Sequence, residues 1–403
     1  MVAAEQSYAD ARPGATSLTI AGEPIRIQII TSLQDAEPIW RELESGDSIY
    51  TPYQRFDLVA AWQRHVGTIT GVELFAVVGS DLSGRPLFLW PLGLTKKWPL
   101  KTLHFLGAKH SSFNGGLWRR EAARGIRREE LWSLLKHIAA DRGIDLLTFY
   151  RQPLNWSGIA NPFTMLPHQP SEPCIRLDLD SGDDVRTSVL AQVTKSHNLR
   201  AKERKLTKLP GYRYYVASTE EEVSRLLTSF FADKAAHLAA QGVTDVFAEP
   251  GVPEFIREAC SQQLASGTPP IEIHAIESSD EVIAMFAGSC DGQRFSCMFN
   301  TYTLGPQSRN SPGLVLLVHI VGNCFDRGLK VFDLGVGQAT YKTLFCNEPE
   351  PLVDSFVPLS PLGRLTAGAV GVTFEAKRRI KETPALWNAV QFFRRLRARP
   401  SEK

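Results

Sequence analysis

The sequence predicts a mixed α/β (α+β) fold of two domains, each a mixed, largely antiparallel sheet flanked by helices. The chain has 403 residues, which is more than a single hydrophobic core usually organises. Strand-like and helix-like segments alternate along its length, and a content of 43% hydrophobic and 22% charged residues is ordinary for a globular protein. The net charge of +2 provides no overall field that would draw the chain to DNA or to an anionic membrane.

The termini and the special residue types narrow the class of protein further. No apolar run approaches the roughly 18 residues of a membrane span, and the acidic N-terminal stretch lacks the apolar run of a signal peptide. We therefore expect a disordered leader over residues 1–24 and a cytoplasmic location. The six cysteines form no CxxC pair and the nine histidines show no HxH, HxxxH or HExxH spacing, so we expect free thiols and no metal site.

The first domain is expected over residues 25–182. Residues 25–32 read as a strand, and a helix follows that buries Trp40 and Leu43. Thr51 and Pro52 have the pattern that begins a second helix. Residues 73–79 and 86–94 predict a β-hairpin, and 101–107, 128–143 and 144–150 predict strand, helix and strand, with the helix ending at Gly143.

Two segments between the domains are irregular or strongly polar. Residues 151–173 contain many prolines and turn formers, and long loops of this kind are often functional. Residues 183–210 predict a linking helix that contains the basic run KSHNLRAKERKLTK. Its lysines and arginines point around the helix rather than along one side. We favour a solvated helix between the domains and keep anion binding as the alternative.

The second domain, expected over residues 211–360, begins with a strand at 212–217. A helix follows whose apolar residues from Val223 to Leu238 form one stripe, and a further helix covers 253–266. Residues 271–278, 282–290 and 294–303 are three closely spaced strands, which predicts an antiparallel meander. Further helices are expected over residues 361–403.

Residues 294–346 carry the strongest indication of chemistry, because they read as strand, polar loop, apolar helix, strand and short helix. Ser311 is a good N-cap, Pro312 a good first helical residue and Gly328 a good terminator. The helix is almost wholly apolar and must be buried. Its N-terminus opens onto a polar loop, so its free N–H groups and positive dipole end suit a diphosphate.

This arrangement resembles the GNAT superfamily of acyltransferases. In that family a strand leads through a turn to a helix N-terminus that holds the pyrophosphate of coenzyme A, and the next strand splays away to admit the pantetheine arm. More narrowly, the chain is similar to the CelD-type branch associated with cellulose or exopolysaccharide biosynthesis, which is related to the FemABX aminoacyltransferases. The resemblance rests on TPYQRFDLVAAWQRH and GRPLFLWPLGL, and then on KSHNLRAKERKL, MFNTY, SPGLVLL, RGLKVFDLGVGQATYK and PLGRLTAG.

The resemblance implies two tandem GNAT-like domains, the first on the acceptor side and the second catalytic. It implies acetyl-CoA or another acyl-CoA as co-substrate. The residues expected on the cofactor are Arg309, Ser311, Gly313, Leu314 and Lys342. The segment RNSPG departs from the glycine-rich Q/RxxGxG/A loop of simple acetyltransferases, so the acyl donor stays open, with acetyl-CoA favoured.

The resemblance also nominates a proton donor. In many GNAT enzymes a tyrosine after the splayed strand protonates the departing thiolate, and the position that matches here is Tyr341. The alternative is that Tyr341 only packs against Phe345. Asp333 ends a buried strand, where an acidic residue needs a partner, so it is either a hydrogen-bond hub or an acceptor for a substrate hydroxyl or amine.

One pair of residues on the strand before the polar loop should face the cleft. Asn300 and Tyr302 alternate along it with Phe299 and Thr301, and we choose Asn300 and Tyr302, the former as a catalytic and the latter as a substrate-binding residue.

The acceptor is expected in the cleft between the two halves, reached by Asn114 and by the loop that contains Trp156, which could stack on a sugar ring. The leading hypothesis is direct N- or O-acyl transfer to a saccharide or a small molecule, with possible contact with polysaccharide biosynthesis proteins. One alternative is FemABX-like transfer from aminoacyl-tRNA, with the basic helix holding phosphates. The other is a non-catalytic scaffold of a polysaccharide synthase complex.

Overall fold

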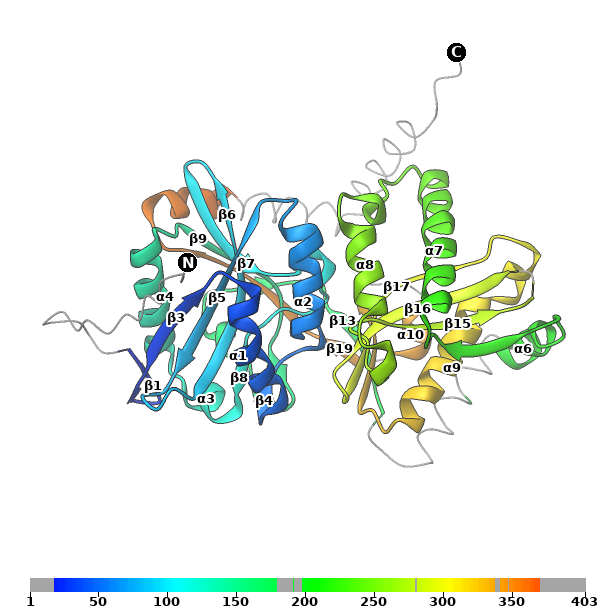
Figure 1. The fold of residues 1–403 in the computed structure, drawn as a ribbon, viewed down its shortest axis with the longest axis horizontal. Coiled ribbons are helices and arrows are strands. Elements are labelled where there is room, and N and C mark those ends of the chain that lie inside the picture. Colours follow the sequence, from blue (N-terminus) through cyan, green and yellow to red (C-terminus); the bar gives the residue numbers. More distant parts are fainter. Residues whose placement is uncertain are drawn as a thin grey trace, which may run out of the picture. The chain divides into compact units, whose positions relative to one another are not determined.

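The computed structural model describes residues 18–179, 191, 198–279, 281–337, 341–346 and 348–369. They divide into two compact units, shown in Figure 1. Of the described residues, those within 18–63, 70–172 and 351–367 belong to the first unit, and those within 64–69, 173–350 and 368–369 belong to the second. Both units are sheets flanked by helices, which confirms the predicted fold class. Regular structure begins earlier than expected, because β1 (Thr19–Ile20) pairs with β2 (Glu23–Pro24) inside the predicted leader.

The main sheet of the first unit has the order β12-β20-β9-β7-β6-β5-β3. Its strands are β3 (Arg26–Ile30), β5 (Val72–Ser80), β6 (Pro86–Lys97), β7 (Leu100–Phe105), β9 (Leu146–Pro153), β12 (Gln169–Pro170) and β20 (Leu352–Pro358). Neighbours along it are antiparallel except for β7 and β9, which are parallel. β5 and β6 form the predicted hairpin. The short strands β4 (Ser48–Ile49) and β8 (Leu117–Arg119) pair beside β6, and β10 (Asn155–Trp156) pairs with β11 (Ile159–Ala160).

The first unit contains α1 (Leu33–Ser45), α2 (Phe56–Trp62), α3 (Arg120–Gly125) and α4 (Arg128–Arg142). Short helical turns of this unit lie at Pro52–Gln54, Ala108–His110 and Pro162–Met165, and a further turn, Gln63–Gly67, leads into residues 64–69 of the second unit. The prediction that the second helix begins at Thr51 and Pro52 is wrong. The Thr51 hydroxyl caps only a single turn, because Arg55 is extended (φ −61°, ψ 135°) and α2 starts after it. Gly143 ends α4 with φ +64°, as predicted.

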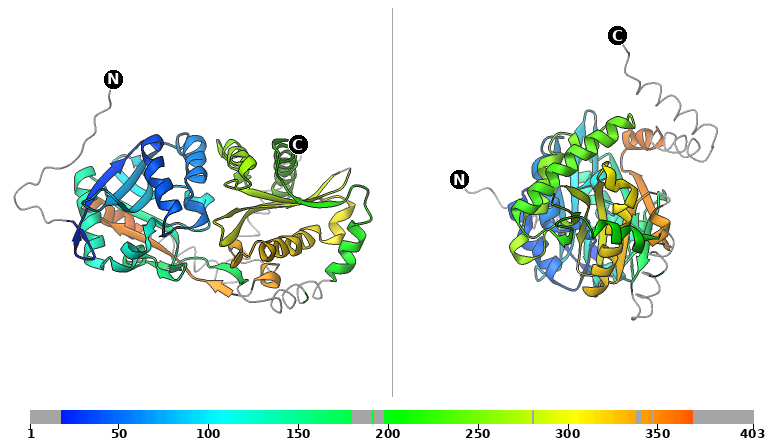
Figure 2. Two further views of the ribbon diagram at one scale, coloured as in Figure 1. Left: turned by 60° about the horizontal axis from the view of Figure 1, so that its bottom comes forward. Right: turned by 90° about the vertical axis from the view of Figure 1, so that its right-hand side faces the viewer.

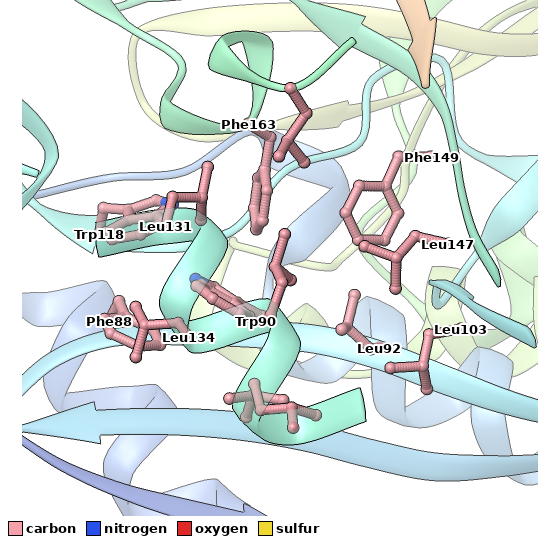
Figure 3. Close-up of a cluster of buried hydrophobic side chains, with 14 of the residues drawn as sticks. Phe88, Trp90, Leu92, Leu103, Trp118, Leu131, Leu134, Leu147, Phe149 and Phe163 are labelled. Atoms are coloured by element: carbon pink, nitrogen blue, oxygen red, sulfur yellow. The ribbon is translucent and has the colours of Figure 1, made fainter. Parts of the chain in front are cut away.

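Figure 3 shows the aromatic core of the first unit. Phe88 and Trp90 from β6 stack with ring centroids 4.6 Å apart, and Trp118 from β8 lies 4.8 Å from Phe88. Phe163, from the long connection after β9, is fully buried against Trp90 and Phe149. Part of the connection that looked functional in the sequence therefore serves to complete the core.

The sheet of the second unit has the order β14-β15-β16-β17-β18-β13-β19. Its strands are β13 (Cys174–Asp178), β14 (Arg213–Val216), β15 (Glu272–Glu277), β16 (Val282–Cys290), β17 (Arg294–Tyr302), β18 (Val331–Val336) and β19 (Glu348–Glu350). β15, β16 and β17 form the predicted antiparallel meander, whereas β17 and β18 are parallel.

Helices cover both faces of this second sheet (Figure 2). α7 (Glu220–Ala240) and α8 (Val252–Ser261) lie on one face, and the apolar α9 (Pro312–Asp326) lies buried on the other. α6 (Leu199–Leu206) packs against α9. Short helical segments lie at Val246–Ala248, Leu264–Ser266, Pro306–Asn310 and Lys342–Phe345, the last being α10. Of the predicted linking helix, only residue 191 and residues 198–210 are described.

The predicted domain boundaries are wrong for two strands, which are exchanged between the halves of the chain. β13 was assigned to the first domain, yet it pairs with β18 and β19 of the second unit. β20 was assigned to the second domain, yet it pairs with β9 and β12 of the first unit. In both units a helix joins two parallel strands, and an antiparallel strand from the other half of the sequence then extends the sheet.

Two further predictions were that no segment spans a membrane and that helices follow residue 360. Among the helices of the described residues, none combines the length and apolar character needed to cross a bilayer. Residues 361–369 are helical, at the start of the predicted C-terminal helices. Residues 370–403 and the leader residues 1–17 lie outside the described part of the chain.

Candidate active site

The site begins where β17 and β18 part. Their parallel ladder covers only three residue pairs, from Arg294 opposite Val331 to Ser296 opposite Asp333, although β17 continues to Tyr302. The end of β18 bends at Gly335 and Gly337, whose φ angles of +72° and +97° favour glycine. Beyond Ser296, the edge of β17 makes no ladder contact with β18 in the described residues.

A β-bulge decides which side chains of β17 face α9. Phe299 is opposite Ala287 and Cys297 is opposite Gly288, so Met298 is an extra residue. Because alternation restarts after the bulge, Asn300 and Tyr302 share a face with Cys297, which belongs to the core beneath α9. Phe299 points the other way and meets Phe230 of α7, with ring centroids 4.8 Å apart.

Tyr341, directly before α10, joins this group. Burial raises the pKa of Tyr341 to about 12, and the nearby Cys297 adds to the rise, while a hydrogen bond with the Asn300 side chain opposes it. Its ring also packs against the core cluster that contains Phe345. The two roles considered from the sequence are therefore compatible, and the phenol is protonated at neutral pH.

The N-terminus of α9 lies beside the same strand. Ser311 adopts a left-handed conformation (φ +49°, ψ 52°) and makes no side-chain cap, contrary to the prediction. Its hydroxyl instead accepts a hydrogen bond of 2.8 Å from the ammonium of Lys202 on α6. A Cβ atom placed on Gly313 would lie 3.7 Å from the Tyr302 ring. The helix terminus, a cation and Tyr302 are thus neighbours.

Lys202 is a site residue that sequence reasoning did not single out. It lies in the basic run for which anion binding was the alternative to simple solvation. Arg309, expected on the cofactor, is exposed in the turn Pro306–Asn310 that leads into α9. Leu314 packs at the edge of the core, and its N–H donates to the Ser311 carbonyl at 3.0 Å. Because this N–H is already bound, the backbone of Leu314 has no N–H to donate to a ligand.

Lys342 does not have the cofactor-binding role expected of it. It is buried, and its ammonium donates to the backbone carbonyls of Gly335, Val336 and Gly337 at 3.1, 3.1 and 3.0 Å. Burial lowers its pKa. Because an ammonium has three N–H donors, none remains for a phosphate, and Lys342 instead fixes the bend at the end of β18.

Asp333 is a hydrogen-bond hub, one of the two roles that the sequence offered, and its contacts argue against the catalytic role. The carboxylate is fully buried and accepts hydrogen bonds from Arg294 Nε at 2.6 Å, from the Ser296 hydroxyl and from the Gly335 N–H at 2.8 Å. Arg294 also pairs with Glu350 at 2.7 Å. Both carboxylate oxygens are therefore occupied by the protein itself, and the network joins β17, β18 and β19.

The two residues expected to reach the acceptor lie inside the first unit. Asn114 is buried, and its side-chain amide donates to the Tyr150 carbonyl at 3.0 Å. Trp156 is only 7% exposed and packs 5.1 Å from Phe113, so the expectation of an exposed tryptophan is wrong. Both residues support the fold of the loop rather than a surface.

In the first unit, helix α4 takes the place that α9 has in the second unit. The N-terminus of α4 is already occupied by a carboxylate of the protein itself. The Glu130 carboxylate accepts from the Thr19 hydroxyl at 2.8 Å, from the Gly22 N–H at 2.9 Å and from Arg127. Burial opposes the charge, yet these hydrogen bonds lower the pKa of Glu130 to about 2. A carboxylate at the positive end of the helix leaves no place for a phosphate there.

The comparison with known families agrees with this placement. A family model described as an acetyltransferase (GNAT) domain matches residues 194–343, which run from before α6 to Thr343 within α10. The second unit carries a GNAT acetyltransferase domain. The chain is accordingly an acyl-transferring enzyme. The match includes Lys202, the N-terminus of α9 and Tyr341.

Solved structures extend the likeness of fold to both units. FemX matches with a TM-score of 0.55 and 10% identity, covering 85% of this chain and 100% of FemX. A conserved protein of unknown function from Bacteroides thetaiotaomicron matches with a TM-score of 0.51 and 11% identity, covering 83% and 100% of the two chains. A search of curated proteins finds no significant match. At such identities the likeness concerns the fold alone, and the CelD-type branch stays a prediction.

Proposed function

We propose that the GNAT domain transfers an acyl group from an acyl-CoA, with acetyl-CoA the favoured donor, to an amine or hydroxyl group. The observation that supports this most is one continuous set of contacts. Lys202 meets Ser311 at the N-terminus of α9, Gly313 lies beside Tyr302, and Tyr302 and Asn300 lie beside Tyr341. A phosphate-binding end and a proton donor are thus joined along the open edge of β17.

The hydrogen-bonding groups along this edge suit the binding of a CoA thioester. The diphosphate would lie at the N-terminus of α9, where the helix dipole, the Gly313 N–H and the Lys202 ammonium are available, with the exposed Arg309 close by in sequence. The pantetheine arm contains amide groups, and beyond Ser296 the unpaired edge of β17 offers backbone partners for them.

The proposed reaction is a direct transfer. The acceptor nitrogen or oxygen attacks the thioester carbonyl carbon, the C–S bond breaks, and the Tyr341 phenol gives its proton to the departing thiolate. A raised pKa keeps that phenol protonated until the thiolate forms. Burial raises the pKa of the nearby Cys297 thiol well above its usual range, so Cys297 is a poor nucleophile and a covalent acyl-enzyme is not part of the proposal.

The acceptor that we favour is a saccharide or another small molecule in the cytoplasm, with a role in exopolysaccharide or cellulose biosynthesis and contact with the proteins of that process. This part rests on the sequence resemblance to the CelD-type branch. A second candidate is transfer from an aminoacyl-tRNA. The basic residues Arg200, Arg204, Lys205 and Lys208 of α6 and its end favour it, because their side chains are exposed among the described residues and phosphates attract such charges.

The test is calorimetric titration with acetyl-CoA and with desulfo-CoA. Both should bind, and Lys202→Ala should weaken binding about tenfold, since a charge-assisted hydrogen bond contributes roughly 1.5–3 kcal/mol. Lys205→Ala removes an exposed lysine from the same helix and should leave the affinity unchanged. Gly313→Glu puts a carboxylate at the helix terminus and should abolish binding.

Failure of the unmodified protein to bind any acyl-CoA would refute the proposal. The same protein would then be titrated with aminoacyl-tRNA at several salt concentrations. Steeply salt-dependent binding would favour the second candidate, and no binding would favour the non-catalytic scaffold.

A further inference from the structure

Helix α7 runs along β17 on the face opposite α9. Three contacts in chain order show this register: the Phe230 ring lies 4.8 Å from Phe299, and the Lys234 ammonium donates to the Asn300 carbonyl at 2.9 Å. One turn later, the His237 ring lies 5.5 Å from Tyr302. His237 therefore lies beside the part of β17 that carries the proposed site.

Two buried polar atoms in this region have no hydrogen-bond partner among the described residues. They are Nε2 of His237 and the hydroxyl oxygen of Thr301, whose side chain shares the α7 face of β17 with Phe299. Leaving a buried polar group unpaired costs about 1–3 kcal/mol. Both atoms are therefore available to hydrogen-bond a molecule bound beside β17.

The groups around His237 suit it to accept a proton. Asp233 lies one turn earlier on α7, and its pKa is raised by burial and lowered by the nearby His237. The charge of Glu281 also raises the pKa of Asp233. The Lys234 ammonium is bound to the Asn300 carbonyl. From β17 the neighbour is Tyr302. Asp233 is therefore the carboxylate beside His237 on α7.

We infer that His237 is the general base of the acyl transfer and that Thr301 binds the acceptor beside it. This inference rests on the proposed function and adds the acceptor side to it. Because β18 has left the edge of β17 here, groups on the α7 and α9 faces meet at Tyr302, which contacts His237, lies near Tyr341 and borders Gly313.

The proton balance is then complete. The acceptor N–H or O–H bond breaks as its nitrogen or oxygen bonds to the carbonyl carbon, and that proton passes to Nε2 of His237. When the C–S bond breaks, the CoA thiolate takes the phenol proton of Tyr341. Afterwards His237 releases its proton to water and Tyr341 regains one, so the net reaction moves only the acyl group. The acceptor must be an uncharged amine or a hydroxyl compound.

The experiment measures CoA release from acetyl-CoA between about pH 5 and 9, with water alone and with glucosamine as the probe acceptor. The unmodified enzyme should lose activity at the acidic end. His237→Gln should reduce the rate about 100-fold, as expected for loss of a general base. It should also remove the loss of rate at acidic pH from the reaction with water, which has no amine group to protonate. Acetyl-CoA affinity, measured by calorimetry, should not change. His137→Gln, an exposed histidine on α4 of the first unit, is the matched control.

A second variant gives a readout other than activity. Thr301→Val removes the unpaired hydroxyl while keeping the shape of the side chain, so the apparent Tm should rise by a few degrees while the KM for glucosamine increases. A lower Tm would mean that the hydroxyl has a structural partner and would remove it from the acceptor site.

The outcomes separate this inference from the proposed function. If the unmodified protein does not bind acetyl-CoA, the proposed function fails first. If it binds acetyl-CoA but His237→Gln keeps the rate and the pH profile, the base assignment is wrong. Binding without any acceleration of hydrolysis or transfer would also overturn it, because a base at this position would activate water as well.

Discussion

Replacing Asp333 by Asn should destabilise the second unit without affecting the affinity for acetyl-CoA. The amide keeps an oxygen for the Gly335 N–H, but it turns an NH2 group toward the donors of Arg294 and Ser296. Removing one partner of a buried ion pair costs about 3–5 kcal/mol. Because Glu350 still pairs with Arg294 at 2.7 Å, we expect the lower end, about 3 kcal/mol.

The measurement is thermal unfolding followed by circular dichroism, together with calorimetric titration below the transition. For a unit of this size 1 kcal/mol corresponds to about 2–4 °C, so the second unit should melt roughly 6–12 °C earlier. The control is Asp178→Asn on the same sheet, which breaks a partly exposed pair with Arg176 at 3.1 Å. Exposed pairs contribute about 0–1 kcal/mol, so that variant should melt within a few degrees of the unmodified protein.

The reasoning would be refuted by an Asp333→Asn protein that melts with the unmodified one. If such a protein also lost turnover, Asp333 would have the catalytic role that its burial argues against. A drop in Tm for both aspartate variants would show that the sheet, rather than the buried network, is sensitive to change.

Three further predictions follow from the same contacts. Tyr341→Phe should reduce kcat about 100-fold with an unchanged Kd for acetyl-CoA, and the unmodified enzyme should show no tyrosine-dependent loss of rate below about pH 10, because a pKa near 12 keeps the phenol protonated. Lys342→Met should lower the Tm rather than the CoA affinity, since the ammonium holds three backbone carbonyls; calorimetry showing the reverse would restore it to the cofactor site. Glu130 has a folded pKa of about 2 against an ordinary 4.5, so its stabilisation is present above about pH 4.5 and is lost as the pH falls toward 2. Urea unfolding should therefore show a difference between Glu130→Gln and the unmodified protein that shrinks on acidification, and a constant difference would contradict this.

Local patterns in the sequence were enough to predict most of the secondary structure. The meander of β15 to β17, the limits of α9 and the end of α4 at Gly143 follow from periodicity and end signals within a few residues. Such features depend on neighbours in the chain, which the sequence displays directly. Strand alternation also grouped Asn300 with Tyr302, but the bulge at Met298, which sets the face that they share, was not visible in the sequence.

Features that depend on distant partners could not be predicted. The Lys202 contact with Ser311 joins residues 109 positions apart, and no spacing rule relates them. Lys342 looked available for a phosphate because the bend whose carbonyls hold it exists only in three dimensions. Trp156 looked exposed because its loop is rich in turn formers, yet Phe113 packs against it. Burial of a loop is decided by the core beneath it.

The two-repeat organisation suggested self-contained domains, whereas the strands β13 and β20 cross over. A strand's period reports which face is buried but not which strand pairs with it. The short polar linker and the repeated order of elements are compatible with two arrangements. In one, β13 and β20 pair within their own halves of the chain, and in the other each pairs with the opposite half. Only the registers, such as Leu177 opposite Phe332 and Phe356 opposite Thr148, decide between them.

The late position of β20 has a consequence for synthesis of the chain. β9 ends at Pro153 and its partner begins at Leu352, so the 198 residues 154–351 separate them. At roughly 5–20 residues per second, a ribosome needs about 10–40 s to produce that stretch. During this time the nascent first unit exposes the unpaired edge of β9. Another chain can pair with such an edge, which promotes aggregation. Chaperone protection of the half-made chain, more than the stability of the finished one, should therefore limit how much protein a cell accumulates.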